Sequence, residues 1–193
     1  MIQAVQLGRR FGERDVLRGL DLDIPSGSFL LVTGGNGSGK STLLSLLAGL
    51  LAPTAGELTV DARREQIGYV GHEPLVYEEL TALENLELFG RLYRVSERRE
   101  RAGMLLERYA LWEARNERVS TFSRGMKQRL ALCRALLHEP ELVLLDEPYA
   151  GLDAAGALLL DDELTDLTGV KTLVVSSHLP ERIEHLATLR LAL

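Results

Sequence analysis

The stretch from Gly34 to Thr42 restricts the possible folds of this chain more than any other segment. It follows an apolar run, Phe29 to Val32, and it precedes an apolar, helix-forming segment, Leu43 to Leu51. The order is therefore that of a buried strand, a glycine-rich loop and a helix N-terminus. The residues of the loop are Gly34, Gly35, Asn36, Gly37, Ser38, Gly39, Lys40, Ser41 and Thr42. Their spacing, Gly-x-x-x-x-Gly-Lys-Ser, is typical of a phosphate-binding loop, and the alternative is a glycine-rich turn before an ordinary helix.

Each part of this loop has a physical reason to bind phosphate. Glycines can adopt positive φ, so that successive backbone N–H groups converge on one point. The helix that begins at the loop adds unpaired amides and the positive end of its dipole. We expect all nine residues to surround the phosphates of a nucleotide, with Lys40 reaching the β- and γ-phosphates and the Ser41 hydroxyl binding Mg²⁺.

Length, charge and cysteine content narrow the class of protein. The 193 residues are enough for one α/β domain, or for one domain that carries a small insertion. The net charge of -6 argues against a nucleic-acid partner, because nucleic-acid-binding surfaces are usually basic. The single cysteine, Cys133, lies in an apolar helical pattern, so we expect a core residue in a reducing cytoplasm. We expect no signal peptide, and the longest apolar run is too short to span a membrane.

The hydrophobic pattern predicts strands that alternate with helices. The predicted strands are 2–7, 16–24, 29–32, 57–61, 66–70, 142–145, 172–176 and 188–193, and the predicted helices are 43–51, 123–137, 154–167 and 180–187. This alternation predicts a mainly parallel sheet with ligands at the C-terminal ends of its strands.

Residues 81–111 interrupt the alternation with a helical pattern, which we interpret as an insertion. The insertion carries a run of arginines, namely Arg91, Arg94, Arg98, Arg99 and Arg101. This run is either a solvated helix face or a docking surface.

A second group of candidate residues follows two of the buried strands. Asp146 and Glu147 come directly after the apolar run Leu142 to Leu145. Asp146 is suited to hold Mg²⁺, and Glu147 to polarise the water that attacks a γ-phosphate; the alternative is an acidic pair that caps a helix. His178 follows the strand 172–176, where its imidazole could meet the γ-phosphate or could serve as a structural hydrogen-bonding residue.

The stretch Thr121-Phe122-Ser123-Arg124-Gly125-Met126-Lys127-Gln128-Arg129 resembles the signature sequence of ATP-binding cassette (ABC) proteins, which usually reads Leu-Ser-Gly-Gly-Gln. Gly151-Leu152-Asp153 resembles the loop that crosses the dimer interface in that family. Together with the P-loop, Asp146-Glu147, His178 and Phe11, the resemblance spans essentially the whole chain. It implies an ATPase with ATP and Mg²⁺ as its ligands.

The resemblance implies a particular fold and set of partners. The expected fold is α/β, with a RecA-like P-loop core (1–76 and 126–193), a helical subdomain (77–125) and a small antiparallel β subdomain, all in a single domain 1–193. Two cassettes would close head to tail, so that Ser123 and Gly125 contact the γ-phosphate bound by a second ATPase subunit. Phe11 would stack on adenine; the alternative is a core phenylalanine. The family also implies an integral membrane permease, which would hold the chain on the cytoplasmic face of the cell membrane.

Some residues depart from the usual cassette pattern. His72 stands where most cassettes have a glutamine that links the metal site to the membrane partner, so we expect it either in the catalytic site or at the cap of its strand. Gly71-His72, followed by Leu80 to Leu86, resembles the ATPase subunit of the haem exporter of cytochrome c maturation. Export of another substrate, or a soluble cassette without a transport role, is the alternative. Arg124 replaces a signature glycine, and the short connection 61–66 suggests a trimmed antiparallel subdomain.

Overall fold

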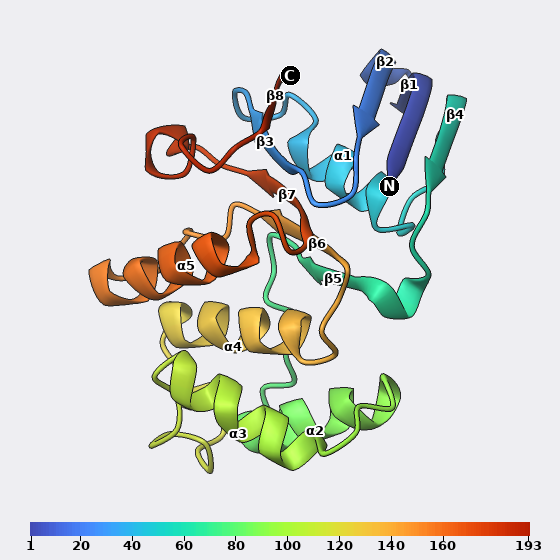
Figure 1. The fold of residues 1–193 in the computed structure, drawn as a ribbon. Helices are drawn as coiled ribbons and strands as arrows, with labels where there is room; N and C mark the ends of the chain where they lie inside the picture. The colour runs from blue at the N-terminus through green and yellow to red at the C-terminus, as the bar shows by residue number, and fades with distance from the viewer.

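The structure, a computed structural model, describes residues 1–193. Its centre is a five-stranded parallel sheet in the order β5-β6-β7-β3-β8 (Figure 1). The strands are β3 (Phe29–Thr33), β5 (Ile67–Val70), β6 (Leu142–Asp146), β7 (Thr172–Ser176) and β8 (Leu189–Ala192). The predicted parallel sheet is therefore confirmed.

The inner strands are buried on both faces, which explains their continuous apolar runs. Successive side chains point to opposite faces, and β3 divides its residues accordingly. Phe29 and Leu31 belong to a cluster of 26 buried residues, whereas Leu30 and Val32 belong to a cluster of 14. The sheet thus separates two hydrophobic cores.

The smaller core lies between the sheet, α1 (Lys40–Leu47) and a three-stranded antiparallel sheet in the order β2-β1-β4 (Figure 1). Those strands are β1 (Ile2–Phe11), β2 (Arg14–Ile24) and β4 (Ala55–Val60). The single-turn 3₁₀ helix η1 (Arg64–Gln66) connects β4 to β5. The expected small antiparallel subdomain is present, and its first two strands are longer than the sequence pattern predicts.

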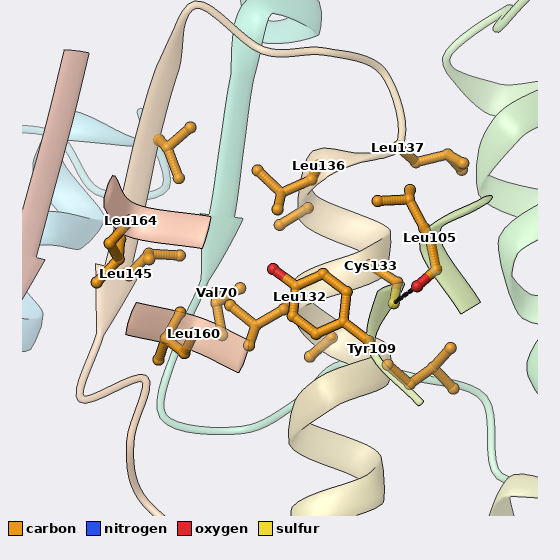
Figure 2. Packing of buried hydrophobic residues seen from close by; sticks show 14 of the residues in the cluster. Val70, Leu105, Tyr109, Leu132, Cys133, Leu136, Leu137, Leu145, Leu160 and Leu164 are labelled. Atoms are coloured by element: carbon orange, nitrogen blue, oxygen red, sulfur yellow. Dashed lines mark hydrogen bonds between the residues drawn. The ribbon is translucent and has the colours of Figure 1, made fainter. Parts of the chain in front are cut away.

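The larger core holds α4 (Arg124–Leu136) and α5 (Ala154–Leu167), with α2 (Ala82–Leu92) and α3 (Arg98–Arg108) packed beyond α4 (Figure 1). Tyr109, which follows α3, is 1% exposed and lies among leucines of α4 and α5 (Figure 2). Cys133 is buried beside it, with its thiol 3.5 Å from the Leu105 carbonyl oxygen, and burial raises the pKa of this thiol. Cys133 is thus a core residue, as predicted.

The helical insertion begins where its sequence indicates. Thr81 caps α2 by accepting a hydrogen bond from the Glu84 amide, and the Glu84 carboxylate accepts one from the Thr81 amide. In the arginine run, Arg99 and Arg91 pair with Glu87, at 2.6 and 3.9 Å. Arg101 instead pairs with Glu139, which follows α4, at 3.5 Å, and a docking role of the run stays a prediction. The 3₁₀ helix η2 (Val119–Thr121) leads from the insertion into α4.

One predicted helix is wrong. Instead of a helix over 180–187, the chain forms a single 3₁₀ turn, η3 (Pro180–Arg182), followed by further turns into β8. Ile183 is buried in the larger core, and Leu186 and Ala187 pack partly buried against it, but the chain must reach β8 at Leu189, so it forms turns in place of a longer helix. No helix of the structure has the length and apolar character needed to cross a membrane.

Candidate active site

The P-loop joins the end of β3 to the start of α1 and depends on its glycines. Gly34, Gly37 and Gly39 have φ values of 148°, 76° and 110°. A Cβ atom on Gly34 would also lie 2.6 Å from the Leu193 carbonyl oxygen. Only glycine fits such a backbone without strain, so the spacing in the sequence reflects the geometry of the loop.

The N-terminus of α1 is open to an anion. Its N-cap is Gly39, no side chain caps its amides, and its first turn holds no acidic residue. Lys40 is only 6% exposed, and its Nζ donates to the carbonyl oxygens of Gly34 at 2.8 Å and Gly35 at 3.2 Å. Free amides, a helix dipole and a buried ammonium therefore converge on one site.

A cavity of 530 Å³ lies against the P-loop at the C-terminal ends of the parallel strands. Asn36, Gly37, Gly39, Lys40, Ser41 and Thr42 line it from the loop and α1. His72, Glu147 and His178 line it from segments that follow β5, β6 and β7. The fold thus collects residues that are widely separated in sequence into one cavity, as the strand ends of a parallel sheet allow.

Glu147 and His178 are in direct contact within this cavity. The His178 amide donates to Glu147 Oε2 at 2.9 Å, and His178 Nε2 lies 3.1 Å from Glu147 Oε1. Glu147 has a φ of 50°, and its amide donates to the Ser176 hydroxyl at 2.9 Å. Lys40 Nζ is 3.7 Å from Glu147 Oε1. The carboxylate therefore sits between the imidazole and the P-loop lysine.

Asp146 is the last residue of β6 and is 2% exposed. Its Oδ1 accepts a hydrogen bond from the Ser176 hydroxyl at 2.6 Å, whereas its Oδ2 is buried without a partner. A buried carboxylate oxygen is costly without a donor or a cation. Together with the Ser41 hydroxyl in the neighbouring cavity, it offers the oxygen ligands that Mg²⁺ prefers, so these residues fit the metal.

His72 is exposed and lies at the border of two cavities. It lines the P-loop cavity and also a smaller one of 290 Å³, which reaches Gln128 and Asp146. His72 and the proposed metal ligand Asp146 therefore line the same small cavity. Whether its ring takes part in the chemistry stays a prediction.

The signature residues lie outside the P-loop cavity. Ser123 is the N-cap of α4, and its hydroxyl accepts from the Met126 amide at 3.2 Å. Gly125 packs closely against the loop between β6 and α5. A Cβ atom on Gly125 would be 2.9 Å from the Gly151 carbonyl oxygen in that loop. The side chain of Arg124 lies across Gly151, where a Cβ would meet its methylenes at 2.8 Å. The arginine that departs from the signature is thus accommodated by a glycine.

Phe11 does not line the cavity. Phe11 is 45% exposed at the end of β1, so the alternative of a core phenylalanine is wrong. The Arg9 guanidinium lies 4.5 Å from its centroid and covers one face of the ring. Arg14 and Val16 of β2 line the cavity instead, and no motif marks them in the sequence. Adenine stacking on Phe11 stays a prediction.

Ser176 is a further residue that the sequence does not single out. It binds both members of the acidic pair, accepting from the Glu147 amide and donating to Asp146. Its position at the end of β7, two residues before His178, is the only available signal.

The sequence of this chain matches a known protein family over most of its length. The model of the family described as ABC transporter matches residues 17–150, well over half of the chain. The chain belongs to the ABC transporter family. It is 35% identical to the ABC transporter ATP-binding protein NatA of Bacillus subtilis, over 96% of this chain and 82% of NatA.

Two further relatives have names that describe resistance or export. The chain is 40% identical to the daunorubicin resistance ATP-binding protein DrrA3 of Streptomyces coeruleorubidus, over 86% of this chain and 56% of that protein. It is 36% identical to the Nod factor export ATP-binding protein I of Azorhizobium caulinodans, over 96% of this chain and 62% of that protein. The chain thus spans less than two thirds of both relatives.

Solved structures agree with the fold. A structure of the ATP binding subunit of an ABC transporter has a TM-score of 0.91 and 27% identity, covering 100% of this chain and 85% of that one. A dimeric bacterial ABC transporter cassette has a TM-score of 0.88 and 30% identity, covering 100% of this chain and 94% of that one. The expected ABC nucleotide-binding fold is confirmed, and the chain is an ABC ATPase.

The resemblance to the haem exporter is not supported. Of the three relatives named above, one is named for daunorubicin resistance and one for Nod factor export, and none is named for cytochrome c maturation. The few residues that suggested it, Gly71-His72 and Leu80 to Leu86, form a loop and the start of α2, which do not specify a cargo.

Proposed function

We propose that this chain binds Mg-ATP in the P-loop cavity and hydrolyses it to drive export through a separate membrane permease. The observation that carries the proposal is the convergence of Lys40, Glu147 and His178 in one cavity, with the unpartnered Asp146 oxygen beside it. The resistance and export names of the relatives support export of a substrate other than haem.

The geometry suggests how hydrolysis would proceed. The P-loop amides and Lys40 would neutralise the phosphates, and this stabilisation grows as charge develops on the γ-phosphate. Ser41 and Asp146 would hold Mg²⁺, which supplies additional positive charge at the phosphate oxygens. Glu147 would accept a hydrogen bond from the attacking water and orient it, and His178 would contact the γ-phosphate.

A second ATPase subunit would complete the site. Ser123 and Gly125 lie outside the cavity of their own chain, so they are free to face the nucleotide of a partner. A post-hydrolysis cassette with bound ADP and Pi, 32% identical with a TM-score of 0.84 and covering 92% of this chain and 88% of that one, is dimeric. We therefore propose a head-to-tail homodimer in the ATP-bound state.

The membrane association would come from the permease. Because no helix here can cross a membrane, we propose that the chain binds at the cytoplasmic face through that subunit. We propose no nucleic-acid partner, given the net charge of -6.

The test is co-purification followed by an activity assay. The tagged chain should isolate an integral membrane protein, and the complex should hydrolyse Mg-ATP, whereas Glu147→Gln should isolate the same protein without turnover. Transport-linked stimulation of ATPase activity should appear when the complex is placed in vesicles. A chain that hydrolyses ATP but binds only soluble partners would support a soluble cassette instead.

A further inference from the structure

Outside the P-loop cavity, Asp161 accepts three hydrogen bonds from two side chains on different segments. It lies in α5, and its Oδ1 accepts from the Tyr149 hydroxyl at 2.6 Å and from Arg182 Nε at 2.9 Å. Its Oδ2 accepts from Arg182 Nη2 at 2.6 Å. The Arg182 guanidinium also lies 5.4 Å from the centroid of the Tyr149 ring. One carboxylate thus binds two side chains that also contact each other.

Those two side chains belong to the segments that carry the catalytic residues. Tyr149 comes two residues after Glu147 and lines the P-loop cavity. Arg182 comes four residues after His178, in η3. Asp161 therefore joins the loop after β6 to the loop after β7, from a third element that carries no catalytic residue.

The helix that carries Asp161, α5, is packed against the larger core. Leu160 and Leu164, on either side of Asp161, are fully buried in the larger core.

The ion pair between Arg182 and Asp161 is bidentate, and such pairs are strong and directional. Both side chains are about two thirds buried here. Burial raises the pKa of Tyr149, so its hydroxyl stays protonated and donates to Asp161. The hydrogen bond to Asp161 raises the pKa of Arg182.

We propose that Asp161 is a positioning residue for ATP hydrolysis, which holds the two loops together so that Glu147 and His178 stay in contact. The inference rests on the proposed ATPase site. Within that site the two catalytic residues touch only through the 2.9 Å and 3.1 Å contacts already described. The pairing of β6 with β7 and the hydrogen bonds of Ser176 position these residues from the strand side, and an anchor on α5 would hold the loops that follow them.

The proposal separates turnover from nucleotide binding. The P-loop belongs to β3 and α1, and none of the hydrogen bonds of Asp161 reaches it. Loss of the carboxylate should therefore lower kcat while leaving the affinity for nucleotide nearly unchanged. Displacements of about 1 Å among catalytic groups can cost up to about 100-fold in rate.

The first experiment compares two neighbouring carboxylates on the same helix. Asp161→Ala should lower kcat by about 10-fold, with the Kd of a fluorescent ATP analogue unchanged. Asp162→Ala is the matched control, because Asp162 is exposed and makes no hydrogen bond or ion pair. Asp161→Asn, which can still accept from Tyr149, should give an intermediate kcat. Equal kcat values for Asp161→Ala and Asp162→Ala would overturn the proposal.

A double-mutant cycle distinguishes positioning from general stability. Tyr149→Phe and Arg182→Ala should each lower kcat in the wild-type background, and neither should lower it further in Asp161→Ala. Fully additive effects would contradict the proposal.

Hydrogen exchange tests the same anchor without any turnover. Amides of 147–152 and 178–183 should exchange faster in Asp161→Ala than in Asp162→Ala, while those of the P-loop should not change. If the wild-type chain fails to hydrolyse ATP, the proposed function is wrong, but this measurement still decides whether Asp161 holds the loops. Unchanged exchange in both segments would refute the anchor.

Discussion

The N-termini of α1 and α4 are both expected to face phosphate, yet they differ in how much of a binding site each one contains. The amides of α1 have no side-chain cap, and Lys40 lies buried beside them. At α4 the Ser123 hydroxyl already accepts from the Met126 amide, and the helix end lies outside the P-loop cavity. The first is therefore an anion site within one chain, whereas the second lacks the loop and the ammonium that would hold phosphate on its own.

The two helix ends therefore differ in what each can bind on its own. A helix end with a buried lysine can bind nucleotide before any partner arrives. A capped helix end adds only its remaining amides and hydroxyl, so it acts on a phosphate that is held elsewhere. Variants at the two ends should therefore separate nucleotide binding from dimer formation.

The largest effect should come from the α1 side. Lys40→Ala removes the buried charge that we propose binds the phosphates, so hydrolysis should fall by at least about 100-fold and nucleotide binding should weaken strongly. Turnover assays and titration with a fluorescent nucleotide measure the two effects. Ser45→Ala, which removes a half-buried hydroxyl that donates to the Ser41 carbonyl oxygen within α1, is the control. Wild-type turnover in Lys40→Ala would refute the P-loop assignment.

Glu147→Gln should bring the two helix ends together around unhydrolysed ATP. Glutamine keeps the shape of glutamate but loses the charge that orients water, so turnover should fall by about 100-fold or more while ATP still binds. Gel filtration with Mg-ATP should then show a stable dimer, with a monomer in its absence. A variant that stays monomeric at saturating ATP would count against the head-to-tail arrangement.

The α4 side should show a smaller and more selective effect. Ser123→Ala removes the cap, at a cost of about 1 kcal/mol to the helix, and in the proposed dimer it also removes one contact to the partner's nucleotide. We expect turnover to fall by about 10-fold, while nucleotide affinity of the monomer does not change. Thr121→Ala removes a nearby exposed hydroxyl as a control. If Ser123→Ala weakens nucleotide binding by the monomer, the contrast between the two helix ends is wrong.

The smallest effect on turnover should come from His72. This residue belongs to neither helix end and lines both the P-loop cavity and the smaller cavity. If its ring replaces the usual glutamine beside the metal, His72→Gln should keep turnover within about twofold and His72→Ala should lower it several-fold. Steady-state ATPase assays at saturating Mg-ATP compare the variants. Equal activity of both variants and wild type would leave His72 with only the role of a strand cap.

Sequence reasoning succeeded where a motif is local. The P-loop glycines, the apolar strand before Asp146 and the bounds of α5 and β7 all follow from short-range patterns, and the structure matches them. It failed for residues 180–187, because their pattern fits a helix of two turns but the chain must reach β8 within a few residues. Short segments are decided by the tertiary path rather than by propensity.

The residues missed by the sequence act through long-range contacts. Asp161 is followed by Asp162 and Glu163, and nothing local tells which of the three carboxylates meets an arginine 21 residues further along. Arg14 and Val16 line the cavity only because the β1–β2 hairpin lies beside the P-loop. Such contacts depend on the fold and cannot be read from spacing.

The alternation of side chains along the central strands has a consequence for unfolding. In β3, β6 and β7, each strand contributes neighbouring residues to both hydrophobic clusters. Neither cluster can lose these strands without exposing the other cluster to water. Opening the layer on one face of the sheet therefore has nearly the same free-energy cost as opening the layers on both faces. The helices α2 and α3 share the larger cluster through α4. We therefore expect the chain to melt in a single calorimetric transition, in spite of its separate layers.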